Sequence, residues 1–186
     1  MAAHRERRWL PPLVVFLVLV AVVFGGYFLA GVLSVPAGPA VVVGSSVAVA
    51  PLSGWTATPL EPSPVTGVPA ERISRGTGTL DVLAPIPARD PTDLLKRYVS
   101  NVLETASEQL RVSEDIQTRT LPSGASAARV RYDGMFTNVP TRIEGELTAV
   151  VSPNGTGVIF DGWGPEGLFG YALRDIRQMV AGSEIV

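Results

Sequence analysis

The 186-residue chain contains no cysteine, and its single histidine is His4, near the N-terminus. The absence of cysteine excludes disulfides, thiol catalysis and cysteine-bound zinc, and residues beyond the N-terminal tail have no imidazole for base or metal chemistry. Lys96 is the only lysine. A Ser-Lys dyad is formally available, but Lys96 falls on the polar side of a helical pattern, which favours a solvated lysine. We therefore expect no enzyme and no bound cofactor or metal.

Charge is also missing from a long segment near the N-terminus. No charged residue occurs from Trp9 to Leu60, and residues 10–35 are almost entirely apolar. About 20 apolar residues cross a bilayer core of roughly 30 Å. We therefore predict a cytoplasmic basic tail over residues 1–9, one transmembrane helix over residues 10–35 that acts as a signal anchor, and a short linker over residues 36–39.

The orientation of this helix follows from the tail. The tail contains three arginines and one glutamate, Arg5, Arg7, Arg8 and Glu6. Basic residues beside a span are retained in the cytoplasm, so we predict that residues 40–186 lie outside it. The alternative is a cleaved signal peptide, whose apolar core of about 7–15 residues is shorter than this one. A cleavage site at Ala48-Val49-Ala50 is disfavoured by Pro51.

Small residues recur at a four-residue spacing within the predicted membrane helix. Ala21 with Gly25, and Gly26 with Ala30, form two pairs of the kind that lets a partner helix approach closely. The alternative is that these residues reflect only the usual glycine and alanine content of membrane helices.

The charge balance narrows the class of partner. The chain has 15 Lys and Arg and 17 Asp and Glu. Without the four charged residues of the tail, 12 basic and 16 acidic residues remain, which gives a net charge of −4. An acidic domain argues against nucleic acid and against an anionic lipid surface as partners. The preference for arginine over lysine, with abundant Ala, Val, Gly and Pro, is typical of a GC-rich bacterial genome.

The hydrophobic pattern of residues 40–186 predicts one α+β domain, an antiparallel sheet with helices packed on it. An amphipathic helix is expected from Asp90-Pro91, and a second from Pro165-Glu166 that buries Leu168. Residues 57–69 contain four prolines and are expected to be irregular. Strands are predicted at 40–43, 47–50, 72–74, 79–83, 112–121, 127–136, 141–151, 157–160 and 184–186.

Three groups of residues in this domain are candidate sites. Glu144 and Glu146 point to the same face of one strand and could act as a glycosidase-type carboxylate pair or bind Ca²⁺. The alternative, which is more common for such pairs, is a solvated face with arginine neighbours. Gly76-Thr77-Gly78 lacks the third glycine and the helix of a phosphate-binding loop. The segment 161–167 presents Trp163 between glycines. We predict Trp163, Pro165 and Glu166 as a contact for a protein partner; the alternative is that Trp163 folds back over the core edge.

The order of elements resembles the PsbP-like fold family, which comprises α/β/α sandwiches found in photosystem extrinsic proteins and bacterial envelope proteins. The likeness rests on Val47-Ala48-Val49-Ala50-Pro51 with Gly54-Trp55, the helix from Pro91 to Leu110, the turn Leu121-Pro122-Ser123-Gly124-Ala125, and the ending Ser183-Glu184-Ile185-Val186. The chain also resembles single-span actinobacterial proteins with such a domain outside the membrane. The resemblance implies an accessory or binding protein.

Two functions from different classes follow. The first is a non-catalytic, membrane-anchored binding domain that serves as an accessory subunit of a membrane or envelope complex, with a membrane protein as partner. The alternative is a carrier of a small molecule or lipid, with a pocket between sheet and helix. An apolar cavity would favour the carrier, whereas an exposed apolar patch would favour the protein partner.

Overall fold

A computed structural model describes residues 38–62, 66–121, 123–137 and 139–185. The predicted tail, the transmembrane helix and its packing residues Ala21, Gly25, Gly26 and Ala30 lie outside these ranges. None of the helices in these ranges combines the length and the hydrophobicity of a membrane span.

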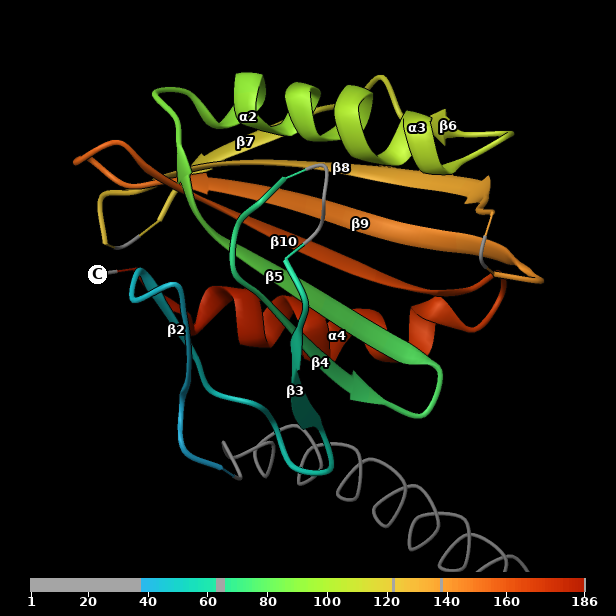
Figure 1. The fold of residues 1–186 in the computed structure, drawn as a ribbon, viewed down its shortest axis with the longest axis horizontal. Helices are drawn as coiled ribbons and strands as arrows, with labels where there is room; N and C mark the ends of the chain where they lie inside the picture. Colours follow the sequence, from blue (N-terminus) through green and yellow to red (C-terminus); the bar gives the residue numbers. More distant parts are fainter. Residues whose placement is uncertain (1–37, 63–65, 122, 138, 186) are drawn as a thin grey trace, which may run out of the picture. The chain divides into compact units, whose positions relative to one another are not determined.

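An eight-stranded, wholly antiparallel sheet forms the centre of the domain (Figure 1). Seven strands lie in the order β3-β4-β5-β10-β9-β8-β6, and β7 also pairs with β8. Their bounds are β3 Thr56–Leu60, β4 Ala70–Arg75, β5 Gly78–Pro87, β6 Arg111–Val112, β7 Gln117–Thr120, β8 Ser126–Met135, β9 Arg142–Val151 and β10 Thr156–Pro165.

Helices cover both faces of this sheet (Figure 1). One face carries a helical layer made of α2 (Pro91–Tyr98), the π-helical stretch η1 (Val99–Leu103) and the short α3 (Glu104–Ala106). The other face carries α4 (Phe169–Ala181). Each helix packs over its own hydrophobic core. The predicted α+β fold with helices on an antiparallel sheet is therefore confirmed.

A second, small sheet lies beside the α4 face, in the order β1-β2-β11. Its strands are β1 (Val41–Val43), β2 (Val47–Val49) and β11 (Glu184–Ile185). The predicted N-terminal hairpin and the final strand are thus both present. The C-terminal segment pairs with the hairpin through Glu184 and Ala48.

The central strands alternate between the two cores because both of their faces are covered. On β10, Val158 and Phe160 belong to the core under α4, whereas Ile159 packs under the helical layer. The side chain at position 161 therefore points toward the helical layer as well. This period of two determines which polar residues reach the cavity described below.

Five predicted segments differ from the structure. The helix expected from Pro91 to Leu110 ends at Ala106. Residues 57–69 are not wholly irregular, because β3 pairs with β4 through residue 60, and its Pro59 is tolerated on an edge strand. The predicted strand over 112–121 is broken into β6 and β7. The strand predicted to end at Phe160 continues to Pro165. The last helix begins at Phe169, and Leu168 is 44 % exposed instead of buried.

Candidate functional site

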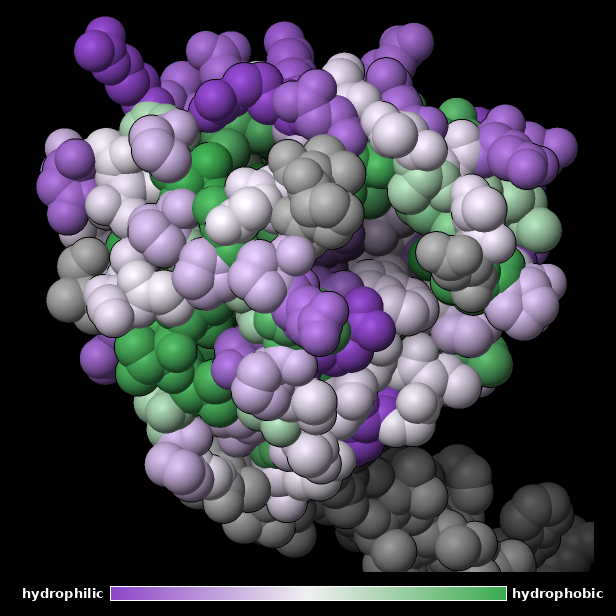
Figure 2. All heavy atoms as spheres, in the orientation of Figure 1, coloured by the Kyte–Doolittle hydropathy of each residue, from purple (hydrophilic) through white to green (hydrophobic). Residues whose placement is uncertain are grey.

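A cavity of about 320 Å³ opens between the helical layer and the sheet. Its apolar wall comes from the helical layer and from the β8–β9 connection, with Val102, Leu103, Ala106, Phe136, Val139 and Ile143. Its polar floor consists of Arg72, Asp81, Tyr132, Asp161 and Trp163 on the sheet, together with Tyr98 at the end of α2. Figure 2 shows a recess beneath the helical layer on this face of the domain, with strongly hydrophilic residues beside it.

Three charged residues of the floor lie in one row across neighbouring strands. Arg72 on β4 is opposite Asp81 on β5, and Asp81 is opposite Asp161 on β10. The register of the sheet therefore brings together residues that are up to 89 positions apart in the sequence. Two of the three are carboxylic acids, so the row carries one more negative than positive charge when both are ionised.

Arg72 and Asp81 form a closed ion pair. The Arg72 Nε donates to Asp81 Oδ1 and its Nη2 donates to Oδ2, both at 2.7 Å. The indole Nε1 of Trp163 donates to the same Oδ2 at 3.1 Å, and the Arg72 guanidinium carbon lies 5.3 Å from the centre of the Trp163 ring. This bidentate geometry is the strong form of a charged pair, and it fixes the indole over the guanidinium.

Asp161 has a different environment. It is 5 % exposed, and its two oxygens accept hydrogen bonds from the hydroxyls of Tyr132 at 2.6 Å and Tyr98 at 3.2 Å. Both donors are neutral. No residue that the structure describes forms an ion pair with Asp161.

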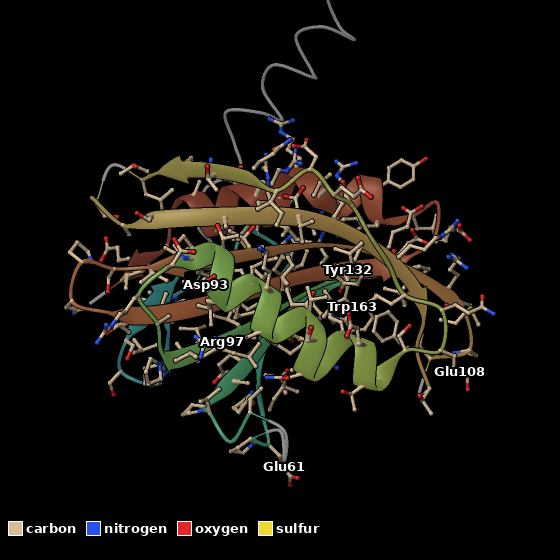
Figure 3. The ribbon with its side chains drawn as sticks, turned by 90° about the horizontal axis from the view of Figure 1, so that it is seen from above. Glu61, Asp93, Arg97, Glu108, Tyr132 and Trp163 are labelled. Carbon is tan, nitrogen blue, oxygen red and sulfur yellow. The ribbon has the colours of Figure 1, made fainter. Side chains whose placement is uncertain are left out.

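Gly145 on β9 allows the Tyr132 ring to reach Asp161. Tyr132 on β8, Gly145 and Trp163 on β10 are opposite one another in register. A Cβ at position 145 would lie 2.3 Å from Tyr132 Cζ, so any side chain there would occupy the space of the ring. Figure 3 looks onto the helical layer and shows Tyr132 and Trp163 close together beside its C-terminal half.

Burial raises the pKa of Asp161 to about 7. Repulsion from Asp81 adds to this increase, whereas the hydrogen bonds from Tyr132 and Tyr98 and the charge of Arg72 oppose it. Burial and the Asp161 charge in turn raise the pKa of both tyrosines well above their usual value. Near neutral pH, Asp161 is thus the group of this floor that exchanges a proton, while both tyrosines stay neutral donors.

The predicted contact residues do not form an exposed loop. Trp163 is half-buried in β10 and takes part in the floor of the cavity. Pro165 ends the same strand, and the exposed Glu166 lies 3.8 Å from Arg142 Nε. Trp163 thus faces the cavity, and Glu166 is not part of its lining. That these three residues contact a partner stays a prediction.

The Glu144 and Glu146 carboxylates are not a joint acidic site. Glu146 is buried under α4, and its Oε1 accepts a hydrogen bond from Arg177 Nε at 2.8 Å. Arg129 and Arg131 lie 3.6 Å from its oxygens. Glu146 is therefore neutralised by arginines on the face opposite the cavity. Across the described ranges, no three His, Cys, Asp or Glu residues are placed to hold a metal ion.

The sequence predicts a functional role for Trp163 but not for the other residues of the floor. The available signal was a charged residue at an inward position of a strand. Asp81 interrupts the apolar run Thr79–Leu83, and Asp161 directly follows Val158–Phe160. To predict that Asp81 and Asp161 are neighbours, one must know that β5 pairs with β10. No local sequence pattern indicates this pairing.

The comparisons with known proteins support the fold. No protein-family model matches the chain, and no curated protein matches it in sequence. Among solved structures, the chain is similar to cyanobacterial PsbP (CyanoP) from Synechocystis, with a TM-score of 0.54 and 14 % identity over 76 % of this chain and 87 % of that one. A protein of unknown function from Pseudomonas aeruginosa gives a TM-score of 0.44 and 10 % identity over 69 % and 80 % of the two chains. The likeness to CyanoP confirms the predicted PsbP-like fold.

Proposed function

We propose that the domain is a non-catalytic binding domain for a small molecule, which residues 10–35 anchor at the outer face of a bacterial cell membrane. The observation that carries the proposal is the cavity between the helical layer and the sheet. It combines an apolar wall with a few fixed polar groups, which is the usual composition of a ligand site.

Binding is favoured over catalysis by what lines this cavity. Asp161 is able to exchange a proton, but covalent hydrolysis and group transfer also need a nucleophile. The one aliphatic hydroxyl among the described lining residues belongs to Thr137, and it donates to the Ala106 carbonyl oxygen at 3.1 Å. The tyrosine hydroxyls donate to Asp161. These hydroxyls are therefore committed to partners within the protein, and none of them is placed to act as a nucleophile.

The cavity also favours a small ligand over an accessory-subunit role. In the described part of the chain, the exposed large hydrophobic residues are Val42, Leu168 and Tyr171. Three side chains are few for a stable protein interface, whose core is larger and apolar. The apolar surface that the fold organises lies inside the cavity instead.

The test is to cover the cavity and to ask whether a bound molecule is lost. Ala106 is an exposed residue at the cavity wall, so Ala106→Trp places an indole over the opening with little cost to folding. Thr105→Trp adds the same side chain at an exposed neighbour outside the lining. We expect native mass spectrometry of the gently extracted full chain to find a small molecule on the wild type and on Thr105→Trp but not on Ala106→Trp. Equal occupancy of the two variants would contradict the proposal.

A protein partner is a second candidate, favoured by one observation. Tyr171 is 83 % exposed and follows Leu168 at the start of α4, close in sequence to the predicted contact residue Glu166. The double variant Leu168→Ser/Tyr171→Ser keeps the core of α4 intact. If the domain is an accessory subunit, this variant loses the membrane proteins that purify with the wild type in near-equal amounts. A wild type that purifies alone would contradict this role.

A further inference from the structure

The charges that line the cavity do not balance. Three charged side chains, Arg72, Asp81 and Asp161, belong to the described lining. Arg72 and Asp81 neutralise each other through two hydrogen bonds of 2.7 Å. Asp161 is left as a buried carboxylate whose partners are two neutral hydroxyls. A carboxylate that is removed from water without a cation is unfavourable, so the lining of the cavity lacks one positive charge when Asp161 is ionised.

Asp161 also has hydrogen-bonding capacity that the protein leaves unused. An ionised carboxylate offers about four acceptor positions. Tyr132 and Tyr98 occupy one on each oxygen, and Asp161 lines the cavity despite its low exposure. An N–H donor on a ligand would therefore find an acceptor at the cavity floor.

Aromatic rings surround the same position. Tyr98, Tyr132, Phe136 and Trp163 all line the cavity, and the rings of Tyr132 and Phe136 meet edge to face with centroids 6.1 Å apart. Aromatic faces attract cations within about 6 Å. One such contact already exists, because the Arg72 guanidinium lies over Trp163 at 5.3 Å. The rings thus favour a positive group and disfavour an anion.

We propose that the ligand of this cavity carries a single cationic amine or ammonium group on an apolar body, with the cation at Asp161 and the body against Val102, Leu103 and Ile143. This inference rests on the proposed function and names the chemical class of its ligand. The apolar wall accounts for the body, and the unpaired carboxylate accounts for the charge.

The titration of Asp161 adds a pH dependence. Burial raises its pKa to about 7. The charged and titratable groups that face it are Tyr98 from α2, Tyr132 from β8, Asp81 from β5 and Arg72 from β4. The pKa of each tyrosine and of Arg72 is raised, so these groups keep their protons below pH 7. Affinity for a cation is therefore expected to fall about tenfold for each pH unit below 7, as Asp161 takes up a proton.

The experiment compares three compounds of similar size and different charge: 2-phenylethylammonium, 2-phenylethanol and 3-phenylpropanoate. The full chain has three tryptophans, so labelling their indole nitrogens with ¹⁵N gives three resonances, and Trp163 is assigned by Trp163→Phe. Its Nε1–H donates to Asp81 in the floor and reports on occupancy. At about pH 8 we expect the ammonium compound to bind at least about tenfold more tightly than the alcohol, and the carboxylate to bind most weakly.

Two variants identify the group responsible. Asp161→Asn removes the negative charge with little change in shape, and we expect it to abolish the preference for the ammonium compound. Glu144→Gln makes the same chemical change outside the cavity lining, and the preference should persist. If Asp161→Asn does not fold, the wild type at about pH 5 provides the same comparison, because Asp161 is then protonated.

The outcomes separate this inference from the function on which it rests. If the alcohol binds as tightly as the ammonium compound, or if the preference survives in Asp161→Asn, the cation is wrong while the ligand-binding function stands. If no compound changes the Trp163 resonance up to its solubility limit, the ligand-binding function is contradicted too.

Discussion

At Asp161 the fold keeps a carboxylate 5 % exposed and gives it two tyrosine hydroxyls as partners. Neutral donors stabilise a carboxylate, but less than a paired cation does in the same surroundings. The raised pKa of about 7 is the consequence. Ionised Asp161 therefore lowers the free energy of unfolding above about pH 7. Such perturbed carboxylates are typical of functional sites.

The first prediction concerns the pH dependence of stability. The pKa of Asp161 is about 7 in the folded chain against an ordinary value of 3.8. The folded state therefore holds the proton more tightly, and the stability this provides is complete below about pH 4 and lost as the pH rises through 7. Asp161→Asn should raise the free energy of unfolding at about pH 8, by at most about 4 kcal/mol, and change it little at about pH 4.

Urea unfolding of both proteins across this pH range measures the difference, with Glu144→Gln as the control for loss of one carboxylate. A difference between Asp161→Asn and wild type that is the same at both ends of the range would show that burial does not perturb Asp161.

The second prediction concerns Gly145. An alanine Cβ there would lie 2.3 Å from Tyr132 Cζ, so Gly145→Ala must displace the ring that binds Asp161. We expect a loss of about 1–3 kcal/mol in unfolding free energy, the usual cost of overpacking, together with loss of ligand binding. Gly170→Ala is the matched control, because its added Cβ meets no atom within 4 Å apart from its chain neighbours and the nearby backbone of α4. Equal stability of the two variants would contradict the ring placement.

For single residues, the sequence indicates which side chains are unusual but not which side chains they contact. Trp163 stands out between glycines, and Asp81 stands out in an apolar run, so each is detectable as unusual. Their hydrogen bond joins residues 82 positions apart. It depends on the register between β5 and β10, which the tertiary fold determines.

At the scale of elements, the helical layer forms one wall of the cavity. Its start is defined by Asp90, whose carboxylate accepts from the backbone N–H groups of Thr92 at 2.8 Å and Asp93 at 2.9 Å. Pro91 occupies the first helical position, where no donor is needed. These local signals made the helix start predictable from sequence.

The third prediction follows from this cap. Asp90→Ala removes both hydrogen bonds and should lower the unfolding free energy by about 1 kcal/mol. Ser100→Ala, at an exposed position within the π-helical stretch, should change it by less than about 0.5 kcal/mol. Thermal unfolding of both variants provides the measurement. An Asp90→Ala variant as stable as the wild type would mean that the helix does not depend on this cap.

Elements that depend on tertiary pairing are harder to predict from the sequence. The four prolines of residues 57–69 suggested an irregular segment, yet β3 forms at the edge of the sheet, where Pro59 is tolerated. Gly162 and Gly164 favour the end of a strand in the sequence, yet β10 continues through both. The two glycines are there because neighbouring elements leave no space for a side chain. A Cβ at Gly162 would lie 2.8 Å from Ile176 Cγ2, and one at Gly164 would lie 2.9 Å from the Thr77 carbonyl oxygen.

At the scale of the whole molecule, we propose that residues 10–35 anchor the domain in the membrane and that the domain lies outside the cytoplasm. The fourth prediction tests this orientation. Alkaline phosphatase fused after residue 186 should be active in cells, and a green fluorescent protein at the same position should not fluoresce. Changing Arg5, Arg7 and Arg8 to Glu should weaken this orientation. Fluorescence of the fused green fluorescent protein in the wild-type chain would contradict it.

The central claim is that the cavity between the helical layer and the sheet holds a small molecule. The most direct measurement is the set of intermolecular nuclear Overhauser effects between 2-phenylethylammonium and the full chain. We expect contacts from the ligand's phenyl protons to the methyl groups of Val102 and Ile143, and from its CH₂–N protons to the Tyr132 and Phe136 rings. Contacts confined to Leu168 and Tyr171, on the surface of α4, would contradict it.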